Sequence, residues 1–544
     1  MEKDFLDFIT EYEEIAFELT KKYSLASYNA AISGKTEDYE LSGKLELELT
    51  KFYADKNKFE YLKKIKKSGL ITDDILKRYL DTMYLEFAAN QYDEDLLKEI
   101  NEISNKLEQN FSTYRAKIDG KEFTDNEIEE ILIHSTDNLK LQKAWESSKQ
   151  IGKFVEEDVI KIVKLRNKAA KQMGYKNHFE KSLLLNEQDP NEIEKLFNEL
   201  DELTKDEFAK VKNEIDVNLA IKLNIDKNQL RPWHYQERFF QHTPNIFNLN
   251  LDKYFDEKDL EKITADFFDS INLNIDDILK NSDLYEKPGK YQHAFCTDID
   301  RSGDIRVLCN IKNNSRWMGT MLHEFGHAVY DKFVSDKLPW QLRNYAHIFA
   351  TESIAMFFGR MVYNPLWLKT TLNLEDKDIM DISDRCKKYL KYDQLVFSRW
   401  CQVIFRFEKS MYENPDQDLN SLWKNLVEKY QMLKYPENRN EPDYAAKIHI
   451  ALYPAYYHNY MLGELLASQL YYFISEKVLK LDNSETGFYG KKDLGEYLKN
   501  LFFGYGALYP WNELIKKATG ENLTPKYYAK DRKSTRLNSS HTIQ

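Results

Sequence analysis

Apolar residues recur every three or four positions along most of this chain, the spacing that places them on one face of an α-helix. Residues 1–115 carry several such patterns, and the first comprises Phe5, Phe8, Ile9, Tyr12, Ile15 and Ala16. Further helical patterns cover residues 160–174 and 385–435, with a break at residues 414–416. Helix-breaking residues are few, with Gly 18 and Pro 12 in 544 residues. We therefore predict a mainly α-helical protein.

Several helix starts are marked by capping residues. Asp73, Thr124 and Asp189 each precede an acidic or polar first turn, and Asp189 is followed by Pro190. These residue types satisfy the free N–H groups of a first turn, and proline is well placed at the first helical position. By the same argument we expect Pro454 to open a long helix.

One segment has the alternating pattern of strands instead. Residues 291–299 and 305–311 alternate on either side of a short polar loop that contains Gly303. Two such runs around a short loop predict a β-hairpin. An exposed strand edge could pair with an extended peptide, although a hairpin that only braces its neighbours is the simpler interpretation.

Composition excludes several classes of protein. The net charge of −12 argues against nucleic acid or an anionic membrane as a partner. No apolar stretch approaches the length of a bilayer span, and the first residues lack a signal-peptide pattern. Four cysteines in so long a chain do not make a disulfide framework. We expect a cytoplasmic protein with reduced thiols.

The motif with the clearest chemistry is His323-Glu324-Phe325-Gly326-His327, in a predicted buried helix. Residues four apart share a helix face, so both imidazoles can bind one metal ion, with Glu324 beside it as a general base. The pattern fixes only three positions, and by itself it could be a chance match.

A third ligand would strengthen this interpretation. Glu352 stands alone among small and apolar residues in the next predicted helix. A buried carboxylate needs a cation or hydrogen bonds, and two histidines with one glutamate form a catalytic zinc arrangement. The alternative is that Glu352 pairs with Arg343 or Arg360.

Near the C-terminus, His449, Tyr457 and Tyr460 cluster within one loop and one helical turn, although Tyr is abundant in this chain. Residues 531–544 change character abruptly to a polar sequence that resembles translated adapter sequence. We predict a non-native or disordered tail there and exclude it from the fold.

Together these motifs resemble the gluzincin peptidases. The match rests on residues 320–327 with Glu352, and two related families compete. The H-E-F-G-H wording is closer to the thimet oligopeptidase/oligoendopeptidase family. The acidic lead-in, K-x-H and paired tyrosines of residues 441–460, with His293-Ala294, are similar to the angiotensin-converting-enzyme family.

This resemblance implies roles for individual residues. His323, His327 and Glu352 would bind one zinc ion per chain, and Glu324 would activate its water. Tyr460 would donate a hydrogen bond to the oxyanion, assisted by His449. Lys447 and Tyr457 would bind the C-terminal carboxylate of the peptide. His293 and Ala294 would pair with the peptide backbone.

The resemblance also implies a fold: a large helical ellipsoid of two halves around a deep central channel, with the hairpin beside the zinc helix. We expect one domain over residues 1–530, in which residues 1–115 could form a lid. The expected partners are short peptides, and the expected state is a monomer.

Three departures from the converting-enzyme pattern bear on this. Asn459 replaces an arginine that helps bind chloride, Met356 replaces an aspartate of the ligand helix, and the spacing from His449 to Tyr460 is one residue longer. We expect a zinc peptidase that releases C-terminal dipeptides. The alternatives are an oligoendopeptidase and a non-catalytic helical binding protein with a retired zinc site.

Overall fold

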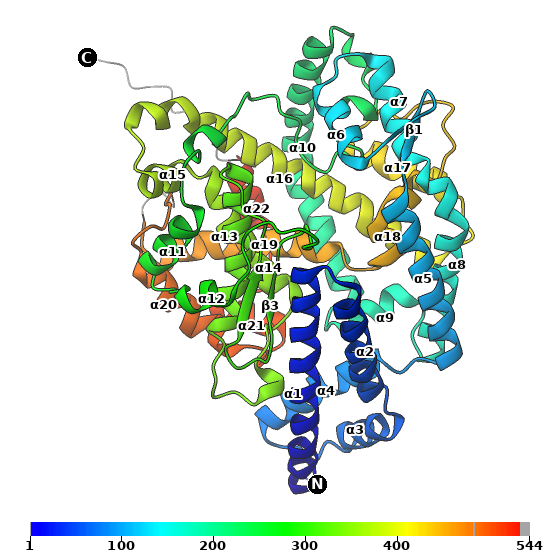
Figure 1. Ribbon diagram of the computed structural model, residues 1–544, viewed down its shortest axis with the longest axis vertical. Helices are drawn as coiled ribbons and strands as arrows, with labels where there is room; N and C mark the ends of the chain where they lie inside the picture. The colour runs from blue at the N-terminus through cyan, green and yellow to red at the C-terminus, as the bar shows by residue number, and fades with distance from the viewer. Residues whose placement is uncertain (1, 482–484, 534–544) are drawn as a thin grey trace.

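The computed structural model describes residues 2–481 and 485–533 and is built mainly from helices (Figure 1). The N-terminal helices are α1 (Glu2–Ser33), α2 (Thr36–Tyr53), α3 (Lys56–Ser68), α4 (Asp74–Ala89) and α5 (Glu94–Thr113). The next group comprises α6 (Asp125–His134), α7 (Asn138–Lys149), α8 (Ile151–Gln172), α9 (His178–Leu185), α10 (Pro190–Leu223), α11 (Leu260–Ser270) and α12 (Asp276–Asn281).

The C-terminal half continues this helical architecture. Its helices are α13 (Ser315–Lys332), α14 (Ile348–Gly359), α15 (Pro365–Leu372), α16 (Asp376–Glu413), α17 (Leu419–Leu426), α18 (Ile448–Leu452), α19 (His458–Phe473), α20 (Lys492–Leu501), α21 (Trp511–Thr519) and α22 (Lys526–Lys533). The predicted tail lies outside the described residues from 534 onward, and α22 extends slightly past the expected boundary at 530. The prediction of a mainly α-helical fold is confirmed.

Capping residues act where the sequence indicated. The Asp73 side chain accepts from Leu76 N at the start of α4. Thr124 caps α6, and Asp189 caps α10 with proline in the first turn. The expectation for Pro454 is wrong, because α19 begins only at His458. Between them Ala455 has φ 52°, a left-handed conformation that an α-helix cannot continue through.

In the described part of the chain, two antiparallel hairpins accompany the helices. The predicted one pairs β3 (Phe295–Asp298) with β4 (Ile305–Leu308), in shorter strands than expected. The second pairs β1 (Ala116–Ile118) with β2 (Lys121–Phe123) and was not predicted. Its loop is Asp119-Gly120 with φ of 51° and 82°, the dihedral signs of a two-residue hairpin turn.

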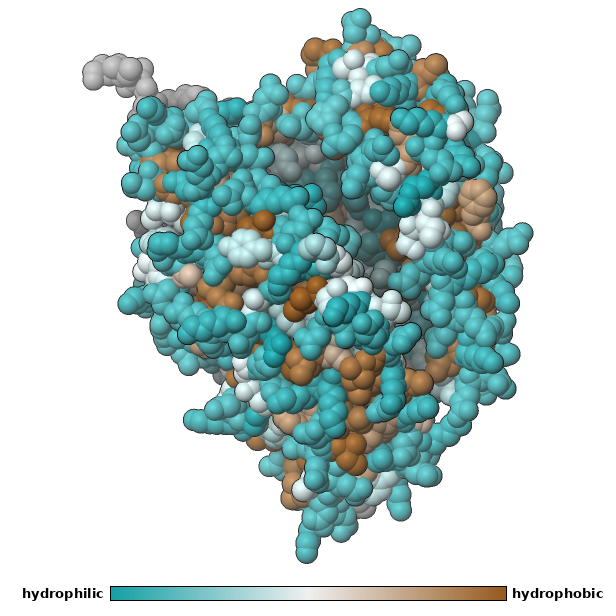
Figure 2. All heavy atoms as spheres, viewed as in Figure 1, coloured by the Kyte–Doolittle hydropathy of each residue, from teal (hydrophilic) through white to brown (hydrophobic). Residues whose placement is uncertain are grey.

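The helices form two sides with a hollow between them. Figure 1 shows α5–α8 with α17 and α18 on one side, and α11–α15 with α20 on the other, while α16 crosses between them. Figure 2 shows that this face of the molecule is hollowed between the two sides. The arrangement matches the expected two halves around a central opening.

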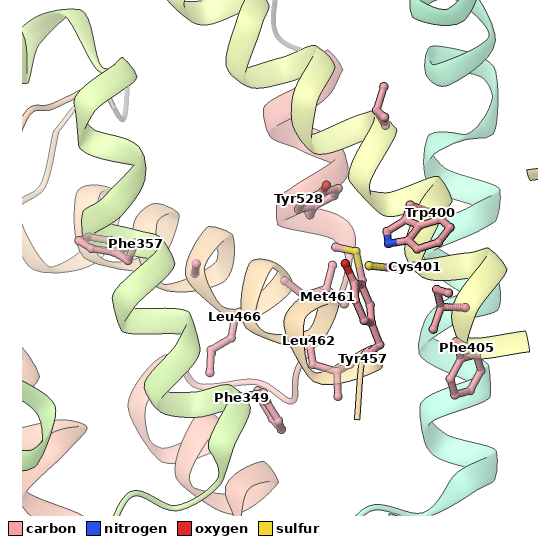
Figure 3. Close-up of a cluster of buried hydrophobic side chains, with 14 of the residues drawn as sticks. Phe349, Phe357, Trp400, Cys401, Phe405, Tyr457, Met461, Leu462, Leu466 and Tyr528 are labelled. Atoms are coloured by element: carbon pink, nitrogen blue, oxygen red, sulfur yellow. The ribbon is translucent and has the colours of Figure 1, made fainter. Parts of the chain in front are cut away.

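Buried apolar side chains of the described residues form one main core, an N-terminal cluster, and a small cluster that packs Tyr28 and Ala31 of α1 against Ile299 and Leu308. In the main core α14, α16, α19 and α22 meet through side chains such as Phe357, Trp400, Met461 and Tyr528 (Figure 3). The N-terminal cluster joins α1–α4 to residues 340–342 and Ala507. The N-terminal helices therefore have a core of their own, seated on the rest of the molecule.

All four cysteines are free, as predicted. Across the described ranges, the helices are all too short or too polar to traverse a lipid bilayer.

Candidate metal centre and active site

The predicted metal ligands lie on α13 and α14, which pack together very closely. Gly326 on α13 makes this possible. A Cβ at Gly326 would lie 2.8 Å from Ala355 Cα and 3.1 Å from the carbonyl oxygen of Ile354. Glycine is therefore the residue that lets the two backbones approach, and the approach brings Glu352 to the two histidines.

The three predicted ligands converge. His323 Nε2 lies 3.5 Å from Glu352 Oε1, and His327 Nε2 lies 3.6 Å from Glu352 Oε2. One ligand atom from each residue lies within 4.8 Å of the other two. Ligands about 2.0–2.1 Å from a tetrahedral zinc ion are roughly 3.3 Å apart, so this donor set fits zinc with little adjustment.

Protonation states favour a cation between these side chains. Burial lowers the pKa of His323 to about 4 and that of His327 well below its usual value. Both rings are therefore neutral at pH 7 and do not form ion pairs with Glu352. Burial, followed by the charge of Glu464, raises the pKa of Glu352 to about 7. A bound divalent ion would satisfy three such lone-pair donors at once.

Second-sphere contacts orient these ligands. His327 Nδ1 lies 2.8 Å from the hydroxyl oxygen of Thr351, which leaves Nε2 directed at Glu352. Gly359 faces His323, since a Cβ there would lie 3.3 Å from His323 Cβ. Met356 has no charge with which to orient a ligand. The contact that orients His327 comes instead from Thr351, which the sequence did not indicate.

Glu324 is held next to the ligands. Its side chain is buried, and the backbone N–H of Cys296 on β3 donates to it. Burial, with Glu352 as the second cause, raises the pKa of Glu324 to about 8. The hairpin therefore positions this carboxyl group, whose raised pKa suits proton transfer near neutral pH.

Tyr460 lies at the start of α19, close to the ligand carboxylate. Burial, with a contribution from Glu352, raises the pKa of the Tyr460 hydroxyl to about 12. The Tyr456 hydroxyl is hydrogen-bonded to it, with 5.5 Å between the ring centroids. Tyr460 is a protonated donor at neutral pH, and Tyr456 is a partner that the sequence did not suggest.

Lys447 and Tyr457 meet at a residue that sequence reasoning missed. Lys447 Nζ donates to Gln241 Oε1 over 3.0 Å, and the Tyr457 hydroxyl donates to the same oxygen over 3.3 Å. Burial lowers the pKa of Lys447 to about 8. Gln241 lies in a long irregular segment between α10 and α11, where no local pattern marks it.

His449 joins this group from α18. Its ring lies 5.0 Å from that of Tyr457, and Nδ1 is a buried atom with no hydrogen-bond partner among the described residues. Burial, then the charge of Lys447, lowers the pKa of His449 to about 4. The neutral ring lies beside Tyr457, and among the described residues no hydrogen bond or ring pair links it to Tyr460.

His293 and Ala294 immediately precede β3. His293 is exposed, and its ring lies 5.4 Å from that of Tyr291 with 56° between the ring planes. β3 pairs with β4 along one edge, and its other edge has no strand partner in the described part of the chain. Tyr291 N donates to Ala31 O, which ties this segment to the end of α1.

The alternative partners of Glu352 are engaged elsewhere. Arg343 Nε donates to the carbonyl of Leu338. Arg360 lies 3.9 Å from Glu464 and donates to Ser468. The arginine pairing considered for Glu352 is therefore not formed.

Asn459 lies in a neutral network instead of at a cationic site. Its side-chain oxygen accepts from Gln188 Nε2 over 2.8 Å, and Gln188 Oε1 lies 2.8 Å from His458 Nε2. Burial lowers the pKa of His458 to about 3. No charge is supplied by this group at neutral pH.

Comparison with known proteins adds a family and two relatives. A family model described as angiotensin-converting enzyme, peptidase M2, matches residues 1–525. The Oligoendopeptidase F homolog of Borreliella burgdorferi is 28% identical over 254 residues, covering 44% of this chain and 40% of that protein. Thermostable carboxypeptidase 1 of Pyrococcus furiosus is 23% identical over 423 residues, covering 71% of this chain and 75% of the relative.

Proposed function

Because this chain belongs to the angiotensin-converting enzyme family, peptidase M2, a family of metallopeptidases, we propose that it is a zinc-dependent peptidase that releases dipeptides from the C-terminus of short peptides. The observation that carries the proposal is the convergence of His323, His327 and Glu352 within 4.8 Å, with Glu324 beside them. The set contains the three protein ligands of a catalytic zinc site, which argues against a zinc site that has lost its activity.

The proposed chemistry divides between the metal and the protein. A zinc ion held by these three residues would supply Lewis-acid chemistry, which lowers the pKa of a bound water and polarises a carbonyl group. Glu324 accepts the proton of the attacking water and returns it to the leaving amine. A carboxyl group buried beside the attacked carbonyl can act in both directions, first as proton acceptor and then as proton donor.

Tyr460 is proposed to stabilise the charge that develops on the carbonyl oxygen. Its hydroxyl keeps its proton at neutral pH and lies near Glu352, so it can donate to an oxyanion in this place. The Tyr456 hydroxyl bonded to it would fix its orientation. His449, placed beside Tyr457, would assist from further away. A single donor of this kind typically contributes about a hundredfold or more to turnover.

Release of dipeptides requires that the free C-terminus be recognised. Lys447, Gln241 and Tyr457 form a buried, hydrogen-bonded set with a positive charge and three polar groups, which suits a carboxylate. The unpaired edge of β3, with His293 and Ala294 before it, is proposed to pair with the peptide backbone. Residues 1–115 would form a lid, consistent with the link from α1 to Tyr291.

An endopeptidase mode is the second candidate. It is favoured by the match to a protein named Oligoendopeptidase F homolog, although that match spans only 40% of the relative. The name of the Pyrococcus protein, a carboxypeptidase, favours action at a C-terminus.

We further propose a monomer that binds one zinc ion and works in the cytoplasm. Four unpaired cysteines support a reducing compartment. The convergent ligand set found among the described residues supports one ion per chain.

A pair of peptides tests the proposal. The zinc-loaded enzyme is incubated with one short peptide as its free acid and as its C-terminal amide, and the products are identified by mass spectrometry. We expect a C-terminal dipeptide from the free acid and much slower cleavage of the amide. Equal cleavage of both would favour the endopeptidase mode, and cleavage of neither peptide would contradict both.

A further inference from the structure

The residue that follows Gln241 carries a second positive charge beside the proposed carboxylate site. His242 Nδ1 lies 3.3 Å from Oδ1 of Asp393, a residue of α16. The same carboxylate oxygen accepts from the backbone N–H of Thr243 over 2.9 Å. The ion pair therefore fixes the loop that carries Gln241 against α16.

The His242 side chain is reached by water although protein atoms surround it. The side chain is 60% exposed, yet burial among protein atoms is the largest single influence on its pKa. A ring that is both surrounded by protein atoms and exposed to solvent is expected in a recess that is open to water. The imidazole lies parallel to Phe397, at 6.4 Å between centroids and 16° between planes. Phe397 in turn lies 6.3 Å from Tyr457, so the recess adjoins the proposed carboxylate site.

The positive member of the pair is the one presented to this recess. The Asp393 side chain is only 23% exposed, and its oxygens already accept from Thr243 N and His242. Burial lowers the pKa of His242. The charge of Asp393 and its hydrogen bond together outweigh this effect, so the pKa of the imidazole rises to about 9. Glu237 adds to this increase and Lys447 opposes it. The exposed ring is thus an imidazolium at neutral pH.

We infer that His242 is a specificity-determining residue that binds the acidic side chain of a C-terminal aspartate or glutamate. The inference rests on the proposed function, since Lys447, Gln241 and Tyr457 would hold the main-chain carboxylate of the same residue. The side chain of that residue would extend toward Phe397 and the imidazolium, where a carboxylate gains a charge-assisted hydrogen bond.

The test compares two free-acid peptides that differ only in ending with glutamate or glutamine, which are nearly equal in size. We expect kcat/KM of the zinc-loaded wild type to be about tenfold or more higher for the glutamate peptide. His242→Gln keeps a hydrogen-bond donor but removes the charge, and it should abolish this preference. Because the ratio is taken within each variant, any general loss of activity cancels.

A second variant separates the charge of the ring from its presence. Asp393→Asn keeps the imidazole but removes the anion that keeps it protonated, so its pKa should fall toward the usual value of about 6.5. The glutamate preference of the wild type should persist to about pH 9, whereas that of Asp393→Asn should disappear above about pH 7. Titration of Lys447 affects both peptides alike and cancels in the ratio.

The outcomes separate this inference from the proposed function. Equal cleavage of the two peptides by the wild type would overturn the inference and leave the peptidase proposal standing. A glutamate preference that survives in His242→Gln would also overturn it. Cleavage of neither peptide would refute the proposed function, and the inference with it.

Discussion

Glu324 is the residue on which the proposed chemistry depends most directly. It is buried, receives the Cys296 N–H, and lies beside a second carboxyl group, Glu352. Two buried carboxyl groups placed together are unfavourable because their negative charges repel each other. Such pairs are therefore found mainly at functional sites, where metal binding or proton transfer requires them. Glu352 belongs to the proposed ligand set with the two histidines. Glu324 is outside that set and remains free to exchange a proton.

Replacing Glu324 with glutamine tests this role. The amide is nearly the same size but cannot accept the proton of the water, so kcat should fall about 10²–10⁴-fold. Peptide cleavage is measured by chromatography at saturating substrate. A variant with turnover within threefold of the wild type would show that another group is the base.

Lys447 gives a pH dependence with a definite direction. Burial lowers the pKa of this lysine to about 8, so it is protonated below pH 8 and loses its charge as the pH rises through that value. The preference for a free-acid peptide over its amide should therefore be greatest below pH 8 and decline above it. The ratio of kcat/KM values for the two peptides, followed from pH 6 to 9.5, measures this.

Lys447→Met is the matched control for that profile. Its ratio should be small and independent of pH. A wild-type ratio that stays constant up to pH 9.5 would contradict the assignment of Lys447 to the carboxylate.

At this scale the sequence revealed residues with motif spacing and concealed their partners. His323, Glu324 and His327 were visible because helical periodicity fixes their relative positions, and Glu352 stood out as a lone carboxylate in an apolar run. Gln241, by contrast, lies in an irregular segment far along the chain from Lys447, and only tertiary packing joins the two.

The pairing of α13 with α14 is the element-level feature that builds the metal centre. It depends on Gly326, where a Cβ would meet the backbone of Ala355 at 2.8 Å. Backbone atoms cannot move aside as a flexible side chain can, so any larger residue must separate the helices. The separation would be transmitted to His323, His327 and Glu352 together.

Two glycine-to-alanine variants on the same helix test this feature. In Gly326→Ala the helices must shift, and we expect a loss of about 1–3 kcal/mol in unfolding free energy with weaker zinc binding. In Gly319→Ala the new Cβ would lie 3.4 Å from Val362 Cγ1, an ordinary contact, and alanine is favoured over glycine in a helix. That variant should be as stable as the wild type or slightly more so.

Thermal unfolding and zinc titration of both proteins supply the measurement. Equal stability and equal zinc affinity for the two variants would show that the close approach at Gly326 does not hold the ligands in place.

Sequence patterns predicted elements well where local chemistry determines them. Asp73, Thr124 and Asp189 cap helices as expected, because a cap depends on its own first turn. The prediction that Pro454 opens a helix is wrong because a residue far away in the sequence contacts this segment. Glu408 on α16 accepts the N–H of Ala455 over 2.8 Å and stabilises a turn in place of a helix start. The Asp119-Gly120 turn of the β1–β2 hairpin is likewise determined by local chemistry, since both residues adopt positive φ.

The whole molecule combines a large body with an N-terminal group that has its own core. Helices α1–α4 pack around a cluster that reaches the body through Trp340, Leu342 and Ala507. Polar contacts also cross this junction: Tyr12 donates to Gln341 over 2.7 Å, Lys21 pairs with Asp300 over 3.1 Å, and Arg78 forms an ion pair with Glu187 and donates to the Ala507 carbonyl. A group with its own core can open as a unit when the contacts at its junction are weakened.

Removal of the Trp340 side chain should loosen this junction. The indole packs near Phe17, beneath Arg301, and donates to the Asp300 carbonyl. Trp340→Ala should increase hydrogen exchange across residues 2–89 more than in α13 or α14. Its control, Trp367→Ala, removes the same side chain from the main core and should destabilise the body instead. A uniform increase in Trp340→Ala would contradict a separable N-terminal group.

The most direct test of the account is the zinc content of three purified proteins, measured by elemental mass spectrometry after exposure to limiting zinc and gel filtration. Wild type and Glu324→Gln should each hold about one zinc ion per chain, while Glu352→Ala, confirmed as folded by circular dichroism, should hold much less because a neutral methyl group replaces the third ligand. A folded Glu352→Ala protein that retains as much zinc as the wild type, with unchanged affinity, would contradict the metal centre on which the proposed activity depends.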